Sequence, residues 1–141
     1  MSDDKFFLDT NIFVYSFDPD APEKAVVAEK LVRRGRTSGL GMVSYQVAQE
    51  FLNVALKRFA AGMTAEELER YSLRVLFPLL QIHSSPQLFL QALHLQSRTR
   101  LSWYDSLIVA AALQGGCKVL YSEDFQHQQR FGDLVVENPF R

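Results

Sequence analysis

Short apolar runs that alternate with helical segments constrain the fold of this chain most strongly. Phe6, Phe7 and Leu8 form a run without polar alternation, which is typical of a central parallel strand covered by helices on both faces. Comparable runs occur at 40–43, 79–82, 119–121 and 134–136. Helical patterns of ten or more residues separate most of them. The alternation predicts a three-layer α/β/α sandwich around a five-stranded parallel sheet.

Cap and stop residues divide the segments between the runs into helices. One helix is predicted from Asp20 to Arg34, with Gly35 starting its exit, and another from Ser44 to Ala61. Thr64 and Glu67 form a capping box for a third helix that Pro78 ends. Two further helices are predicted, one that begins at Ser85 with Pro86 in its first turn and one that begins at Ser102.

Four acidic residues follow these predicted strands or lie just inside the next helix, namely Asp9, Glu50, Asp105 and Asp124. Because a parallel sheet gathers the carboxyl ends of its strands at one edge, we expect their side chains to converge on one pocket. Two carboxylates about 4 Å apart repel by roughly 4 kcal/mol at an effective dielectric of about 20. Such a cluster therefore indicates a bound divalent cation or a raised pKa.

Each of these acids also has a purely structural interpretation. Asp9 and Asp105 stand where a carboxylate can cap a helix, and Ser102 three residues before Asp105 completes a capping-box pattern. Glu50 fits a narrow solvated stripe of its helix, and Asp124 fits a solvated loop. Four independent structural roles at four crossovers would be a coincidence, whereas one metal site explains all four residues.

Composition limits the classes of protein that this chain can belong to. With 141 residues, 48% of them hydrophobic, residues 1–141 are read as a single domain with one core. A net charge of -1 argues against nucleic-acid binding by bulk electrostatics, so any such contact must be local. Cys117 has no partner for an intrachain disulfide, and no apolar run approaches the length of a membrane span. A cytoplasmic location without membrane contact is expected.

Other motifs give weaker signals. Arg33, Arg34 and Arg36 stand near a helix end, where they either complement the helix dipole or contact phosphates. The three histidines lack metal-ligand spacing, so no zinc site is indicated. The chain has no glycine-rich nucleotide-binding motif and no GxSxG nucleophile motif.

The segments LDTN, QEF, YDSLIVAAA and SEDF, in this order, resemble a PIN domain and most closely the VapC-type ribonuclease toxins of prokaryotic toxin–antitoxin pairs. The resemblance covers essentially the whole chain. It implies the strand order 3-2-1-4-5, an acidic pocket for Mg²⁺ or Mn²⁺, and single-stranded or looped RNA as the substrate. A protein antitoxin and a homodimer are the partners expected.

The resemblance also assigns roles to individual residues. Asp9, Glu50, Asp105 and Asp124 match the acidic quartet of the family, which is both catalytic and metal-binding. Asn11 and Ser122 match supporting polar positions, where Ser122 keeps the hydroxyl of the commoner Thr. Glu123 matches a position that is often acidic, and its role stays open. Hydrolysis by metal-activated water needs no 2′-hydroxyl and should leave a 5′-phosphate.

Rival interpretations remain at this stage. A haloacid dehalogenase phosphatase needs a second Asp where this chain has Asn11, and a receiver domain needs a Lys where it has Ser122. A noncatalytic RNA-binding or scaffold module of the same fold is the main alternative from another class. Within the enzymes, a housekeeping RNA-processing nuclease without an antitoxin is the runner-up.

Overall fold

The computed structural model describes residues 3–58 and 62–141 and contains a central sheet with the strand order β3-β2-β1-β4-β6-β5. Neighbouring strands pair in parallel from β3 through to β6, and β5 pairs with β6 antiparallel. The strands are β1 (Phe6–Leu8), β2 (Gly41–Ser44), β3 (Leu80–Ile82), β4 (Val119–Tyr121), β5 (Arg130–Phe131) and β6 (Leu134–Glu137).

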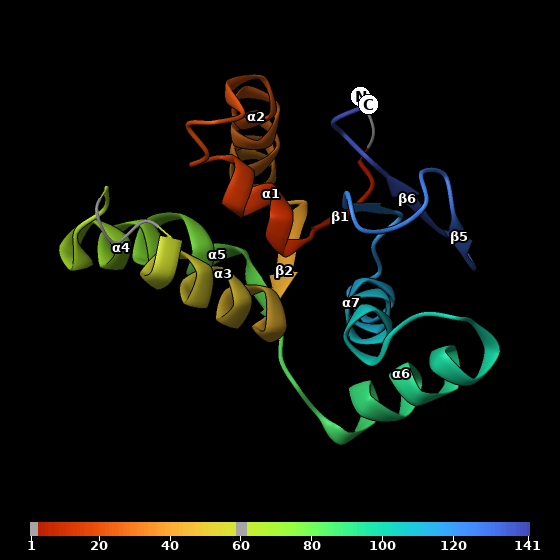
Figure 1. Cartoon of the computed structure of the whole chain (residues 1–141). Helices are drawn as coiled ribbons and strands as arrows, with labels where there is room; N and C mark the ends of the chain where they lie inside the picture. Colours follow the sequence, from red (N-terminus) through yellow and green to blue (C-terminus); the bar gives the residue numbers. More distant parts are fainter. Residues whose placement is uncertain (1–2, 59–61) are drawn as a thin grey trace.

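The helices lie on both faces of the sheet (Figure 1). They are α1 (Thr10–Tyr15), α2 (Pro22–Ser38), α3 (Tyr45–Arg58), α4 (Ala65–Tyr71), a π-helical turn over Ser72–Leu76, α5 (Phe77–Leu79), α6 (Pro86–Arg98) and α7 (Trp103–Gln114). The chain steps from β1 to β2 to β3 in one direction, and then returns to the other side of β1 at β4. Since parallel crossovers are right-handed, α1 to α5 cover one face, and α6 and α7 cover the other.

The core forms where the central strands meet the most apolar helix. Phe7 and Leu8 of β1 are fully buried, and residues 106–112 of α7 are buried all round. Helix α7 packs against β2 and β4, and α6 covers it from outside. This position accounts for the apolar middle of α7.

Most of the predicted elements are confirmed, including the capping box at Thr64 and the side-chain caps at Ser85 and Ser102. The sheet differs from the prediction by one strand, because the two-residue strand β5 forms a short hairpin with β6, the predicted fifth strand. The parallel part keeps the expected order, with β6 in the fifth place. A two-residue strand carries too little periodicity to be found in sequence.

Three helix boundaries also differ from the predictions. Helix α2 starts at Pro22 after the N-cap residue Ala21, and the predicted cap residue Asp20 lies in a preceding turn in which its N–H donates to the Asp18 carboxylate. It continues through Gly35, where a Cβ on facing Gly41 would collide with the Gly35 Cα. The small residue thus serves a close helix–strand approach instead of ending the helix.

The other boundary differences concern the third helical region. Pro78 lies inside α5, in its first turn, and the chain reaches it through the π-helical turn. The predicted end of the preceding helix at Ala61 lies outside the described residues, which follow α3 to Arg58.

Candidate active site

The site lies at the carboxyl edge of the sheet, where the strand order reverses between β1 and β4. Leu8 pairs with Tyr121 at the ends of these strands, so the next residues, Asp9 and Ser122, emerge side by side. The Asp9 N–H also donates to the Tyr121 carbonyl at 3.1 Å. Crevices of this kind at a topological switch point are the usual ligand sites of open α/β sheets.

Asp9 is buried, with 4% of its surface exposed, and both of its carboxylate oxygens accept hydrogen bonds. Oδ1 accepts from the Thr10 N–H at 2.7 Å, so Asp9 does cap α1, and Oδ2 accepts from the Ser122 hydroxyl at 2.6 Å. Ser122 Oγ in turn accepts from the Asp124 N–H at 3.1 Å. The helix-capping role expected for Asp9 is therefore confirmed, and the same carboxylate also lines a cavity.

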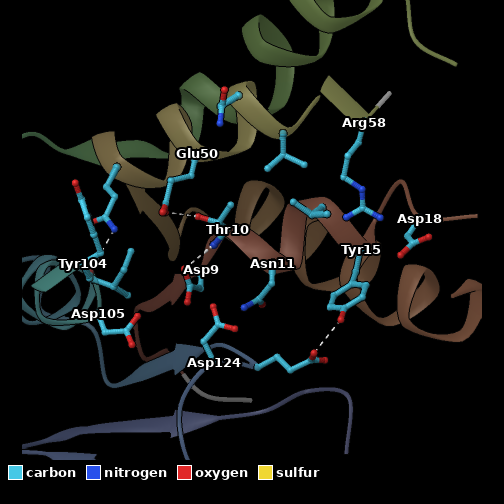
Figure 2. A pocket seen from close by; sticks show the side chains of 16 residues that line it. Asp9, Thr10, Asn11, Tyr15, Asp18, Glu50, Arg58, Tyr104, Asp105 and Asp124 are labelled. Atoms are coloured by element: carbon cyan, nitrogen blue, oxygen red, sulfur yellow. Dashed lines mark hydrogen bonds between the residues drawn. The ribbon is translucent and has the colours of Figure 1, made fainter. Parts of the chain in front are cut away.

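All four predicted acids line one cavity of about 600 Å³, which we call the acidic cavity (Figure 2). Asp9 follows β1, Glu50 projects from α3, Asp105 lies in the first turn of α7, and Asp124 follows β4. The remaining side chains of its wall are Thr10, Asn11, Val14, Tyr15, Asp18, Gln46, Asn53, Val54, Arg58, Tyr104, Ile108 and Glu123. Elements that are distant in sequence thus place their carboxylates around one space.

The electrostatics of the cavity favour a bound cation. Burial raises the pKa of Asp9 to about 7, hydrogen bonds from Ser122 and Thr10 oppose the rise, and the charges of Asp124 and Glu50 add to it. Burial also raises the pKa of Asp105, with a further contribution from Asp124. Negative charges in a partly buried site repel one another unless a cation or a proton is present.

The donor set fits Mg²⁺ or Mn²⁺ in kind. Its candidate ligand atoms are carboxylate oxygens, and both polar atoms of the Asn11 amide are buried in the cavity wall without a hydrogen-bond partner among the described residues. Within residues 3–58 and 62–141, no group of three or more His, Cys, Asp or Glu side chains stands close enough to enclose a metal ion. Mg²⁺ commonly binds through one or two carboxylates together with waters and substrate phosphate, so a sparse set of this kind suits it.

Thr10 also lines the cavity, although sequence analysis assigned it no role in the site. Its hydroxyl donates to Glu50 Oε1 at 2.9 Å and so ties the start of α1 to the middle of α3 (Figure 2). Glu50 is exposed on the cavity side of its helix. The position directly after Asp9 is the signal that could have identified Thr10.

The carboxylate of Glu123 has two hydrogen-bond partners, one in α1 and one in α2. Tyr15 donates to Glu123 Oε1 at 2.8 Å, and Lys24 Nζ bonds Oε2 at 2.7 Å. Although partial burial favours the protonated form, these hydrogen bonds keep the pKa of Glu123 below its usual value. Lys24 also lies over the rings of Tyr15 and Phe140, at 4.4 and 5.4 Å from their centroids.

The predicted arginine cluster lies outside the wall of the acidic cavity. Arg33 forms an ion pair with Glu29, and Arg34 donates to the Tyr121 hydroxyl at 2.8 Å and lies over the Phe6 ring. Arg36 borders a separate hollow beside α2. Among the side chains that the structure describes, Arg58 at the end of α3 is the only cation in the cavity wall. Sequence analysis did not identify Arg58.

Within the described ranges, no helix is both long and apolar enough to cross a membrane.

Sequence and structure comparisons relate this chain to known proteins. The family model for the PIN domain matches residues 6–133. A search of curated protein sequences finds no match. Among solved structures, VapC20 of Mycobacterium tuberculosis, described as a Sarcin-Ricin loop cleaving toxin, superposes with a TM-score of 0.62 at 18% identity. The match covers 85% of this chain and 90% of that one.

Two further structures are similar to the same extent. The structure of VapBC2 from Rickettsia felis is bound to a DNA fragment from the promoter of its own genes. It superposes with a TM-score of 0.61 at 19% identity, and the match covers 94% of this chain and 97% of that one. FitAcB from Neisseria gonorrhoeae superposes with a TM-score of 0.61 at 18% identity. This match covers 96% of this chain and 98% of that one. These likenesses agree with the fold described above, and the family match over most of the length is decisive. The chain belongs to the PIN domain family.

Proposed function

We propose that this protein is a metal-dependent ribonuclease that hydrolyses single-stranded or looped RNA, and that it is the toxin of a toxin–antitoxin pair. The observation that carries the proposal is the convergence of Asp9, Glu50, Asp105 and Asp124 on one cavity at the switch point of the sheet. Membership of the PIN domain family and structural similarity to VapC20, a Sarcin-Ricin loop cleaving toxin, support it.

The proposed division of roles follows from the contacts of each carboxylate. Asp9, Asp105 and Asp124, together with Glu50, are the residues that would hold Mg²⁺ or Mn²⁺. When bound, the ion would neutralise charge at the scissile phosphate and make a water molecule more acidic. Hydrogen bonds from Ser122 and from the Thr10 N–H favour the ionised form of Asp9 that such binding needs.

The proton of the attacking water needs an acceptor that is accessible from the cavity. Glu50 and Asp124 are both exposed, and Glu50 is oriented by Thr10. Either carboxylate can accept that proton, whereas Asp9 is enclosed by its two donors. The Asn11 amide, which has no hydrogen-bond partner within residues 3–58 and 62–141, can donate to a phosphate oxygen.

The antitoxin and the homodimer belong to the same proposal. Large apolar side chains on α3 and in the segment from α4 to α5 are exposed, namely Tyr45, Leu56, Leu73 and Phe77. Tyr45 and Phe77 border a shallow hollow of about 390 Å³ whose wall also includes Leu52 and Leu80. Apolar surface of this kind supports contact with an amphipathic helix of an antitoxin or with a second copy of the chain.

Cleavage of labelled oligoribonucleotides tests the proposal directly. We expect cutting in Mg²⁺ or Mn²⁺, products with a 5′-phosphate, and complete loss of activity in EDTA. Asp105→Asn should be inactive, whereas Lys57→Ala on the outside of α3 should cut normally. Equal cleavage with and without metal, or by Asp105→Asn, would argue for a contaminant, and failure to cut any RNA would favour a binding module.

A further inference from the structure

A second cavity, of about 360 Å³, shares a wall with the acidic cavity. It lies between the first turns of α3 and α7, the start of α6 and the end of β3, and we call it the aromatic cavity. Gln46 and Tyr104 line both spaces. The two cavities are therefore adjacent, so one extended ligand could occupy both. Tyr104 lies at the opposite end of the acidic cavity from Arg58 (Figure 2).

Aromatic rings dominate the wall of the aromatic cavity. Tyr45, Phe89 and Tyr104 keep 45%, 44% and 64% of their surface exposed, and Trp103 lies against Phe89 with ring centroids 6.2 Å apart. Exposed rings around a hollow offer the flat apolar faces on which unpaired nucleobases stack. The size of the space falls within the range of small-ligand pockets, roughly 300 to 1,000 Å³.

The polar groups in this wall are neutral. Among the residues described, the lining contains hydroxyl and amide side chains such as Ser84 and Gln49 but no Asp, Glu, Lys, Arg or His. A phosphate would find no cation there. A neutral heterocycle with hydrogen-bonding edges matches this combination of aromatic faces, amides and hydroxyls.

Gln46 Oε1, at the wall between the two cavities, has no hydrogen-bond partner among the described residues. The Gln46 amide nitrogen donates to the Tyr104 carbonyl at 3.2 Å, which fixes the side chain between the two cavities. Its Oε1 is buried and accepts no hydrogen bond from the part of the chain that the structure describes. An acceptor left in this state is matched by an N–H group of a ligand, such as the exocyclic or ring N–H of a base.

From these observations we propose that the aromatic cavity binds one unpaired nucleobase of the RNA substrate, next to the phosphate that enters the acidic cavity. The inference rests on the proposed ribonuclease function for the identity of the substrate. It adds a specificity site to that function, in which Phe89 and Tyr104 stack on the base and Gln46 accepts from its edge.

Binding of nucleosides can be measured without any cleavage. Trp103 is the single tryptophan of the chain and lines the aromatic cavity, so its fluorescence reports on occupancy. In EDTA, at least one of the four nucleosides should change this emission in a saturable way, and ribose should not. Phe89→Ala should raise the half-saturating concentration about tenfold, as expected for loss of one stacking surface. Leu90→Ala, on the same helix and exposed but outside the cavity wall, should bind as the wild type does.

Cleavage with base-free substrates then separates this inference from the proposed function. Abasic sites are introduced one at a time beside the scissile bond of an RNA that the protein cuts. One of them should lower kcat/KM about tenfold in the wild type, and Phe89→Ala should be insensitive to the same change. Nucleoside binding without RNA cleavage would support the base site and contradict the nuclease proposal. Cleavage that ignores every abasic site, together with unchanged Trp103 emission, would refute the base site alone.

Discussion

The hydroxyl of Ser122 donates a hydrogen bond of 2.6 Å to Oδ2 of Asp9, which joins the carboxyl ends of β4 and β1 inside the protein. The Ser122 hydroxyl oxygen also accepts a hydrogen bond from the Asp124 N–H at 3.1 Å. One short side chain therefore holds one predicted acid through its carboxylate and another through its backbone. Ser122 itself is fully buried.

The first prediction concerns the pH dependence of stability in the metal-free protein. Burial raises the pKa of Asp9 from an ordinary 3.8 to about 7, so between these values the folded state binds a proton that the unfolded chain does not. The contribution of Asp9 to the free energy of unfolding should therefore be greatest below about pH 4 and should fall as the pH rises to about 7. The Asp9 contribution to this fall is on the order of 4 kcal/mol.

Urea denaturation in EDTA at pH 5 and pH 8 measures this effect. Asp9→Asn, which cannot ionise, should lose most of the difference between the two pH values. Ser122→Ala removes a hydrogen bond that lowers the pKa of Asp9 and should enlarge the difference. If the wild type and Asp9→Asn respond equally to pH, the raised pKa of Asp9 is wrong.

The second prediction separates Asp105 from the helix cap beside it. Ser102 Oγ accepts from the Asp105 N–H at 3.1 Å, so the cap uses the serine side chain and only the backbone of Asp105. Ser102→Ala should therefore cost about 1 kcal/mol of stability. Asp105→Asn should abolish cleavage and leave the metal-free stability equal or higher, because burial and Asp124 disfavour its charge.

Thermal melts of both variants, with and without Mg²⁺, check this second prediction. The wild type should gain stability from Mg²⁺ and Asp105→Asn should gain less. A loss of metal-free stability in Asp105→Asn as large as that in Ser102→Ala, with no metal response in the wild type, would make Asp105 a structural residue only.

The third prediction treats Glu123 as a positioning residue. Its two carboxylate oxygens are bonded to Tyr15 and Lys24, and it directly precedes Asp124, so the pair fixes the loop that carries this predicted ligand. Tyr15→Phe keeps the ring that packs on Phe140 at 4.9 Å but removes the hydroxyl, which donates to Glu123 and accepts from Lys24 at 3.3 Å. We expect kcat to fall several-fold, with a higher Mg²⁺ concentration for half-maximal activity.

Lys24→Met should have a similar effect on the Mg²⁺ requirement, and Lys30→Met, an exposed position on the same helix, should have none. Titration of activity with Mg²⁺ is the measurement, because a general loss of stability would not change the metal requirement selectively. Complete inactivity of Glu123→Gln combined with normal Lys24→Met would instead place Glu123 at the metal.

The parts of the fold that sequence predicted are those carried by local signals. Apolar runs such as Phe6–Leu8 and side-chain caps such as Ser102 depend on neighbours in the chain, and both were found where expected. The quartet was predicted as one group because parallel topology brings strand ends together. The start of α2 was misplaced because its N-cap is Ala21, which has no side-chain oxygen to act as a cap signal.

Long-range side-chain contacts account for what the sequence could not provide. Lys24 meets Glu123 across the sheet edge, and Thr10 meets Glu50 between two helices, through contacts that have no periodic signature. Gln46 gains its place between two cavities only when α3 and α7 pack together. Register and rotamer decide these positions, and neither can be read from composition or spacing.

The last prediction concerns phosphate binding. Arg58 is the one cation that the described part of the chain places in the wall of the acidic cavity, whereas Arg33 and Arg34 have partners elsewhere. Arg58→Ala should weaken binding of single-stranded RNA about tenfold and lower the slope of log K against log salt by about 1. Binding is measured in the uncut complex, with Asp105→Asn as the background.

Lys57→Ala removes the adjacent exposed charge outside the cavity and serves as the matched control for Arg58→Ala. Replacing Arg33, Arg34 and Arg36 together tests whether the cluster predicted from sequence contacts phosphates, since a real contact would also lower the salt slope. Arg58 and the arginine cluster should also differ in their effect on cleavage. Arg58 borders the acids, so its loss should raise KM for cleavage, whereas a distant contact should alter binding of long RNA more than of short RNA. An unchanged salt slope in Arg58→Ala would mean that this side chain faces solvent or Asp18 instead of the substrate.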